Sequence, residues 1–354
     1  MRAPTRGLPA LVEKGRAMAK PSNPAVQLTG YGGAECLRVV DLPIPTPGPG
    51  EVRVRVLASS INYTETLIRR HLYPQTAAYK IPFVMGYDVV GEVDELGPDV
   101  TDFEIGDCVA DMTVVGSDAK YRVLKAKDLT LVPVGLDPAE AATLILSWTT
   151  AYQMLHRAAH VQPGQKILIH GAAGAVGQAQ IQLGKLAGFE MWGAAKGRHA
   201  ALIRELGAIP IDYEREDFAN AVPGGFDIVF DGIGENGYRR SFAALKSGGL
   251  LIAIGFSASA QAKRGMASIL ASIMRMYLWG LLPGGKRTRF YSINVMRARH
   301  PDWFKEDLAY LFELLGKKLI KPNVAERISF ADVPNAHRRL EAGGLEGKLV
   351  LCPA

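Results

Sequence analysis

The segment that most limits the possible fold is a glycine-rich run, His170-Gly171-Ala172-Ala173-Gly174-Ala175-Val176-Gly177. Apolar residues 166–170 precede it as a strand would, and the helix-forming residues 178–187 follow it. Small residues in this pattern allow a tight turn, close approach of the backbone to a pyrophosphate, and close packing of helix on strand. A turn that serves packing alone is the other interpretation. The run predicts a dinucleotide site at the helix N-terminus, contacted by Ala172, Ala173, Gly174, Ala175, Val176 and Gly177.

Short apolar runs alternate with helical stretches around and after this turn. They cover residues 166–170, 191–195, 209–211, 226–230 and 250–254. Continuous apolar runs separated by helices are typical of parallel strands that are buried on both faces. The predicted fold class of this region is therefore α/β, a doubly wound parallel sheet of the Rossmann type.

The earlier part of the chain has a different pattern. Residues 51–57 alternate between apolar and polar side chains, which is typical of a half-buried strand, and residues 89–96 and 108–113 predict further strands. Turn-forming residues separate these strands, so we predict a mainly antiparallel, barrel-like domain.

The end of the chain is predicted to return to that first domain. A helix over residues 302–315 is followed by two short strand-like pieces, so the parallel sheet would be inserted within the antiparallel domain. The predicted units are a disordered extension, 1–24, the antiparallel domain, 25–147 with 297–354, and the dinucleotide-binding domain, 148–296.

The identity of the dinucleotide can be argued from the end of the second apolar run. NAD-binding proteins of this architecture usually carry an acidic residue there, which accepts a hydrogen bond from the ribose 2′-hydroxyl. This chain has Lys196 and Arg198 instead, which would neutralise a 2′-phosphate. The alternative is that Arg198 is a solvated charge where the helix 199–206 begins. We predict NADP(H) as the cofactor.

Charge and cysteine content narrow the function classes. Residues 1–20 carry five basic side chains against one acidic, and so hold four of the six net positive charges. The remaining chain has no basic cluster of the kind that nucleic-acid binding needs. The basic start could be a mitochondrial presequence, but a disordered extension or an early start codon is the simpler interpretation. Three widely spaced cysteines favour a reducing compartment, so we expect a cytoplasmic protein without a membrane-crossing segment.

Three ordered motifs resemble those of the medium-chain dehydrogenases/reductases. They are residues 58–66, residues 82–93 and the glycine-rich run. Within that superfamily the chain is most similar to the quinone oxidoreductase (zeta-crystallin-like) and vesicle-amine-transport-protein-like branches, from about Ala25 to Pro353. The resemblance implies that the antiparallel domain is GroES-like and that the protein is a homodimer.

The resemblance also locates the positions where related alcohol dehydrogenases hold zinc. They are matched here by Asn62, by Tyr87 within Gly86-Tyr87-Asp88, and by a residue near Leu146. Asn, Tyr and Leu do not form a zinc site, which requires thiolate, imidazole or carboxylate ligands. The four cysteines of the structural zinc lobe are missing as well, and Cys108 is interpreted as a small buried hydrophobe. We predict no metal.

The catalytic candidates follow from the same resemblance. The side chains matching Asn62 and Tyr73 line the nicotinamide pocket in quinone reductases, whereas Leu67 stands where some relatives have a pocket-facing tyrosine. Asn62 could instead be a turn residue that bonds its own backbone, and Tyr73 a rim aromatic. Further cofactor contacts are expected from residues at or near the ends of successive strands. These are Tyr213, Gly232, Gly255 and Phe256.

These features predict a reductase that moves hydride from NADPH to an apolar small molecule, either a quinone or an α,β-unsaturated carbonyl. Such acceptors need positioning and a hydrogen-bond donor rather than a Lewis acid. The alternatives are an enoyl-type reductase of a specialised biosynthetic intermediate and a non-catalytic, membrane-associated protein that binds NADPH. An apolar helix over 266–282, followed by the basic loop 283–289, could pack in the core or at an interface, cover the substrate, or contact a membrane peripherally.

Overall fold

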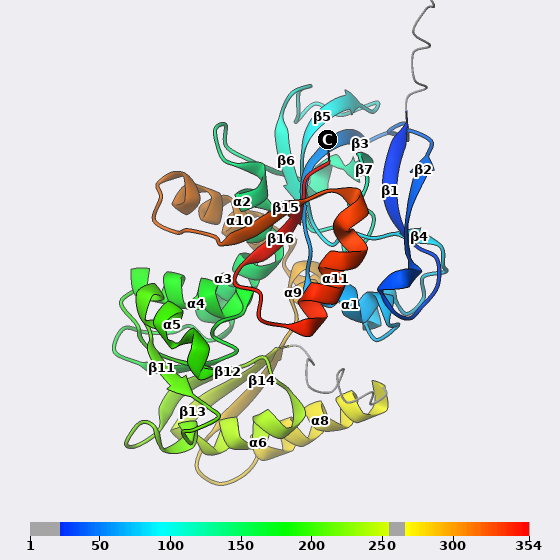
Figure 1. The fold of residues 1–354 in the computed structure, drawn as a ribbon. Helices are drawn as coiled ribbons and strands as arrows, with labels where there is room; N and C mark the ends of the chain where they lie inside the picture. The colour runs from blue at the N-terminus through cyan, green and yellow to red at the C-terminus, as the bar shows by residue number, and fades with distance from the viewer. Residues whose placement is uncertain (1–21, 255–265, 354) are drawn as a thin grey trace, which may run out of the picture.

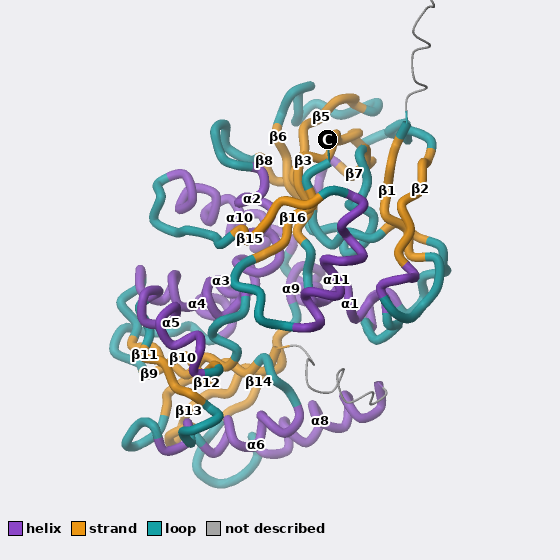
Figure 2. Tube along the Cα trace, in the orientation of Figure 1, coloured by secondary structure: helices purple, strands orange, loops and turns teal. Residues whose placement is uncertain are grey.

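The computed structural model describes residues 22–254 and 266–353. Two sheet-containing parts meet along one side (Figure 1). The N-terminal segments and the last helix and strands form the upper part, and the middle of the chain forms the lower part (Figure 2). The chain thus leaves the upper part, builds the lower sheet, and returns. The boundaries at 147/148 and 296/297 stay predictions.

The upper part is built mainly on antiparallel strands, with β15 and β16 paired in parallel. Its larger sheet has the order β15-β16-β3-β5-β6-β8, with β7 also paired to β3, and a smaller sheet has the order β2-β1-β4. The strands are β1 (Asn23–Leu28), β2 (Leu37–Leu42), β3 (Glu51–Ser60), β4 (Phe83–Val84), β5 (Val89–Leu96), β6 (Cys108–Asp111), β7 (Tyr121–Lys125), β8 (Thr130–Leu131), β15 (Val324–Ile328) and β16 (Lys348–Leu351). The helices are α1 (Tyr63–Arg69), α2 (Pro138–Thr143) and α11 (Val333–Ala342).

Strand β3 shows why these residues form this sheet. Val52, Val54 and Val56 are buried, while the residues between them are partly exposed. Because successive side chains of a strand point to opposite faces, the alternation places one apolar face on the core. Neighbouring β5 and β6 contribute Val89, Val93 and Val109 to the same cluster.

The lower part is a six-stranded parallel sheet in the order β11-β10-β9-β12-β13-β14. Helices α4 and α5 contact each other on one side of it, and α6 and α8 on the other (Figure 1). The strands are β9 (Lys166–His170), β10 (Glu190–Ala195), β11 (Ile209–Asp212), β12 (Phe226–Asp231), β13 (Leu245–Ile254) and β14 (Arg287–Tyr291). The helices are α4 (Ala175–Leu186), α5 (Ala200–Leu206), α6 (Glu235–Ala243) and α8 (Met266–Trp279).

Helices α3 (Thr149–Tyr152), α9 (Ile293–Arg299) and α10 (Pro301–Gly316) lie where the two parts join. Residues 138–158 form a succession of α-helical and π-helical turns. Its π-helical parts are Leu144–Trp148 and Gln153–Ala158. Such insertions occur often at functional sites, and the first one contains Leu146.

Two expectations about residues 266–289 need correction. The apolar helix ends at Trp279 rather than at residue 282, and Gly280 follows it. The last three residues of the basic loop, Arg287 to Arg289, belong to strand β14, which pairs with β13 along the whole of its length. No helix within the described part of the chain combines the length and the apolarity that crossing a bilayer requires.

Helix α11 carries His337, which makes the stability of the fold depend on pH. Its side chain is fully buried, and neither ring nitrogen has a hydrogen-bond partner among the residues that the structure describes. Burial, aided by the positive charge of Arg69, lowers the pKa of His337 from 6.5 to about 3. The unfolded chain therefore takes up a proton at a pH where the folded protein does not.

We predict that the free energy of unfolding falls as the pH drops below 6.5 and keeps falling until about 3, because protonation favours the unfolded chain over that range. Chemical denaturation across this range should show a weaker pH dependence for His337→Gln than for the wild type. His160 is exposed with a φ of 49°, which asparagine tolerates, so His160→Asn is the matched control. Identical pH slopes in wild type and His337→Gln would contradict the prediction.

Candidate active site

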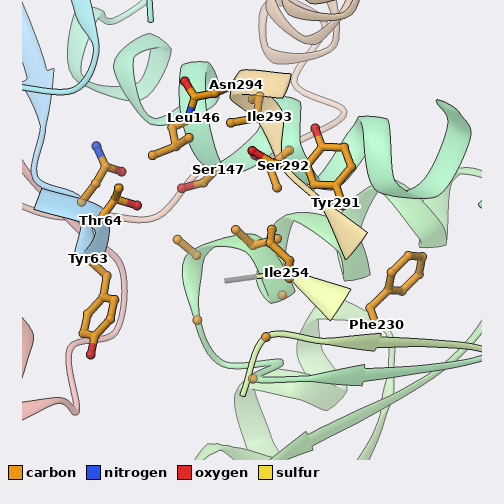
Figure 3. A pocket seen from close by; sticks show the side chains of 18 of the residues that line it. Tyr63, Thr64, Leu146, Ser147, Phe230, Ile254, Tyr291, Ser292, Ile293 and Asn294 are labelled. Atoms are coloured by element: carbon orange, nitrogen blue, oxygen red, sulfur yellow. The ribbon is translucent and has the colours of Figure 1, made fainter. Parts of the chain in front are cut away.

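A cleft of about 1170 Å³ separates the carboxyl ends of the parallel strands from the upper domain. The glycine-rich turn, Gly232 and Ile254 form one wall, and Asn62, Tyr73 and Tyr87 belong to the other. Figure 3 shows Leu146 and Ser147 on the helical stretch between them, near Ile293 and Asn294 of α9. Open parallel sheets bind ligands at this edge.

The turn itself has the geometry that a pyrophosphate requires. Gly171 has a φ of 70°, which favours glycine, and Gly174 precedes the first residue of α4. A Cβ at position 177 would lie 2.5 Å from the carbonyl oxygen of Gly171, so the helix can start this close to the strand only with glycine there. The first turn of an α-helix has N–H groups without partners in the helix, and here its residues Ala175, Val176 and Gly177 line the cleft.

Five of the six predicted turn residues line the cleft: Ala173, Gly174, Ala175, Val176 and Gly177. The sixth, Ala172, is completely buried. A Cβ atom added to Gly193 of β10 would lie 2.8 Å from the Cβ of Ala172. Its small side chain serves the close packing of strand against turn. Gly232 lines the cleft as predicted, whereas Gly255 and Phe256 lie outside the described residues.

The basic residues expected to bind a 2′-phosphate lie just beyond β10. The ammonium of Lys196 is 3.4 Å from a carboxylate oxygen of Glu214, and both side chains are about half exposed. The guanidinium of Arg198 donates to the ring of His199 at 3.1 Å. Tyr213, after β11, is partly exposed, and its backbone N–H donates to Ala195 at 3.3 Å. The structure therefore adds an acidic neighbour, Glu214, that the sequence motif does not reveal.

The three positions where related dehydrogenases hold zinc all line the cleft. They are Asn62, Tyr87 and Leu146. Within residues 22–254 and 266–353, no group of three or more His, Cys, Asp or Glu side chains is arranged to share a metal ion. Cys108 is half-buried, and burial raises the pKa of its thiol to about 11, so it does not offer a thiolate near neutral pH.

The side-chain amide of Asn62 is fully engaged by other protein groups. Its Nδ2 donates to the backbone oxygen of Ser60 at 2.7 Å and to Asp88 at 2.9 Å. Its Oδ1 accepts from the ammonium of Lys348. Asn62 thus combines the two interpretations given to it from sequence, because it bonds a nearby backbone group and also lines the cleft.

Lys348 is a buried cation at the cleft that sequence reasoning missed. Its ammonium is 3.4 Å from the hydroxyl of Ser147 and contacts Asn62. Burial lowers the pKa of Lys348, and the buried carboxylates of Asp88 and Glu65 oppose that shift. Burial raises the pKa of Asp88, and the positive charge of Lys348 opposes that rise. The one available signal was a lysine that begins the otherwise apolar strand β16.

Tyr73 is half-buried and lines the cleft next to Tyr87, which is completely buried. Their hydroxyl oxygens are 2.6 Å apart, and the amide of Asn294 donates to them at 2.7 and 2.8 Å. Burial raises the pKa of Tyr73 and, more strongly, that of Tyr87. Both hydroxyls therefore stay protonated near neutral pH.

Comparison with known proteins agrees with this arrangement. Residues 48–134 match the family model "Alcohol dehydrogenase GroES-like domain", and residues 206–351 match "Zinc-binding dehydrogenase". A quinone oxidoreductase of Pseudomonas aeruginosa is 31% identical over 336 residues, which cover 93% of this chain and 99% of the relative. The chain belongs to the medium-chain dehydrogenases/reductases. This family of oxidoreductases is the one its three ordered motifs resemble.

The chain is also similar, along most of its length, to other known proteins. The synaptic vesicle membrane protein VAT-1 of Tetronarce californica is 30% identical over 328 residues, 89% of this chain and 84% of the relative. A 2-haloacrylate reductase of a Burkholderia species is 28% identical over 306 residues, 84% of this chain and 89% of the relative. A solved mycobacterial protein, described as complexed with NADPH, has a TM-score of 0.81 at 28% identity, covering 94% of this chain and 100% of that one.

The turn of this medium-chain oxidoreductase gives a direct prediction. Gly177→Ala places a methyl group against the carbonyl of Gly171, and opening the turn to relieve that overlap costs about 1–3 kcal/mol. The affinity for reduced nicotinamide dinucleotide, measured by fluorescence titration, should fall by about tenfold or more. Gly316→Ala is the control, because an added Cβ there meets its nearest neighbour at an ordinary 3.6 Å. Unchanged affinity in Gly177→Ala would rule out a pyrophosphate at this turn.

Proposed function

We propose that this protein is an NADPH-dependent reductase that works without zinc and transfers hydride to quinones or α,β-unsaturated carbonyls. The observation that carries the proposal is the composition of the cleft. A glycine-rich dinucleotide turn faces a wall where Asn62, Tyr87 and Leu146 occupy the three metal-ligand positions. Tyrosine hydroxyls and a buried ammonium supply the polar groups instead. The likeness to a quinone oxidoreductase and a 2-haloacrylate reductase supports the same class of acceptor.

NADP(H) is the cofactor that fits the adenosine end of the site. Lys196 and Arg198 follow β10, where the adenosine ribose lies in parallel sheets of this order. Lys196 faces Glu214, but both side chains reach solvent, so a 2′-phosphate can replace that weak surface pair. The mycobacterial relative described as complexed with NADPH supports this choice.

The residues of the cleft suit an acceptor that needs correct orientation and a hydrogen-bond donor rather than a Lewis acid. The bound cofactor would supply a hydride at the nicotinamide. Leu146, Ile254 and Ile293 offer apolar contacts to a flat, uncharged acceptor, which they would also shield from water (Figure 3). The hydroxyl of Tyr73 would donate to the oxygen on which negative charge develops. The ammonium of Lys348 adds a fixed positive charge to the same cavity, held in place by Asn62.

The choice of cofactor can be tested with two variants. Lys196→Ala and Arg198→Ala should each weaken NADPH binding by about tenfold, because a charge-assisted hydrogen bond is worth about 1.5–3 kcal/mol. NADH has no 2′-phosphate, so its affinity should stay the same. Arg204→Ala removes an exposed positive charge from α5 and is the matched control. Equal losses for NADH and NADPH would contradict the proposal.

The reaction can be tested with a panel of acceptors. The purified protein should oxidise NADPH in the presence of quinones or enones but not oxidise simple alcohols with NADP⁺, because the latter reaction needs a Lewis acid to stabilise an alkoxide. Pretreatment with a strong zinc chelator should leave the rate unchanged. A rate that disappears with the chelator and returns on adding zinc would refute the zinc-independent mechanism.

A further inference from the structure

The residue that replaces a metal ligand, Tyr87, belongs to a hydrogen-bonded trio with Tyr73 and Asn294. The three side chains come from separate segments: the loop after α1, the loop between β4 and β5, and the first turn of α9. Asn294 is 221 residues from Tyr73 and 207 from Tyr87 along the chain. Their meeting at the cleft is a product of the fold, and nothing in the established family membership assigns it a role.

Counting hydrogen atoms shows what the trio can do. The amide nitrogen of Asn294 has two hydrogens and donates one to each hydroxyl oxygen. Each tyrosine has a single hydroxyl hydrogen, and the bond between the two hydroxyls uses one of them. Since the amide nitrogen cannot accept, one hydroxyl hydrogen has no acceptor within the trio. It is available to a molecule in the cleft.

The burial of the two rings decides which hydroxyl keeps that hydrogen. Tyr87 is completely buried, whereas Tyr73 is partly exposed at the cleft. The arrangement in which Tyr87 donates to Tyr73 leaves the hydrogen of Tyr73 directed to the more open side. Tyr73 then carries the free proton and accepts two hydrogen bonds on its oxygen.

The backbone around Tyr87 holds it in this position. Its carbonyl accepts hydrogen bonds from the N–H groups of Thr113 and Val114 at 2.9 and 3.0 Å. The preceding Gly86 has a φ of 102°, and a Cβ there would lie 2.2 Å from the backbone nitrogen of Asp118. The loop is therefore packed too closely for the ring to shift without disturbing its neighbours.

We propose that Tyr87 and Asn294 are positioning residues that present the hydroxyl of Tyr73 to the substrate and stabilise the phenolate left after it gives up its proton. This inference rests on the proposed function. The β-carbon of an α,β-unsaturated carbonyl would accept hydride, which carries an electron pair, from NADPH. The electrons of the carbon–carbon double bond would then move toward the carbonyl and form an enolate. The O–H bond of Tyr73 breaks, its proton bonds to the enolate oxygen, and the resulting enol rearranges to the saturated carbonyl compound. The phenolate accepts hydrogen bonds from Tyr87 and Asn294 until water returns a proton.

The trio also determines how the reaction responds to pH. Hydrogen bonds from Tyr87 and Asn294 favour the phenolate of Tyr73 and oppose the effect of burial on its pKa. The charged group that faces Tyr87 is Asp88, whose carboxylate opposes ionisation of Tyr87. Because Tyr73 must be protonated to act, kcat should fall as the pH rises through the pKa of Tyr73. Loss of either supporting residue raises that pKa and moves the fall in kcat to higher pH.

The test uses Tyr87→Phe and Asn294→Leu in the full-length protein, with NADPH and an enone that the wild type reduces. We expect kcat to fall by about tenfold, the loss that corresponds to the net contribution of one hydrogen bond, with the KM for NADPH unchanged. The alkaline fall in kcat should move to higher pH in both variants and be absent in Tyr73→Phe. Tyr31→Phe is the matched control, since its hydroxyl bonds the backbone of Tyr79 outside the cleft.

A second measurement needs no turnover and separates this inference from the proposed function. With tyrosine labelled by ¹³C at Cζ, the Tyr73 resonance can be assigned by its loss in Tyr73→Phe. It should move in Tyr87→Phe and in Asn294→Leu, and stay in place in Tyr31→Phe. A wild type that reduces no quinone or enone would refute the proposed function. Wild-type activity with unchanged kcat, pH profile and Tyr73 resonance in both variants would overturn the positioning role alone.

Discussion

The pairing of β16 with the end of β3 is the interaction on which the rest of the molecule depends. Val350 and Leu351 lie opposite Ser60 and Ser59, and the N–H of Ile61 donates to Leu349 at 2.9 Å. This antiparallel contact joins the last strand to the first domain after the chain has built the whole parallel sheet. Without it, Lys348 and Leu349 would not line the cleft, and Lys348 would not reach Asn62.

Because β16 pairs with β3, the polar groups of the site are held in place before any ligand binds. Asn62 is committed to Asp88, Ser60 and Lys348, so its amide holds other groups in place rather than facing solvent. Buried charges are stable only when paired, and the ammonium of Lys348 lies among the carboxylates of Asp88 and Glu65. Fixed donors in a shielded cavity stabilise developing charge better than water does, because they need not reorient. In the proposed function, these groups act in a cleft that has Asn, Tyr and Leu at the metal-ligand positions.

The pattern of apolar residues predicted the strands of the parallel sheet closely. It failed where the structure of a segment depends on the element that it pairs or packs with. Strand β9 has the bounds expected from its apolar run, and β10 to β12 differ by one residue at one end. Strand β14 was not predicted, because Arg287-Thr288-Arg289 resembles a solvated loop. Arg287 and Arg289 are exposed and Thr288 is partly buried, so it is the pairing with the apolar β13 that makes them a strand. Likewise, the apolar run 266–282 continues past the end of the helix at Trp279, where Gly280 and the turn into β14 interrupt it.

The sequence by itself determined the dinucleotide turn, the order of strands and helices around it, and the residues at the metal-ligand positions. These depend on neighbours within a few positions, where spacing and residue type act directly. Only the tertiary structure decided that Glu214 faces Lys196, that Lys348 enters the cleft, and that Tyr73, Tyr87 and Asn294 share hydrogen bonds. Most of these contacts join segments that are far apart in the chain. Their geometry comes from the packing of whole domains, and no local pattern records it.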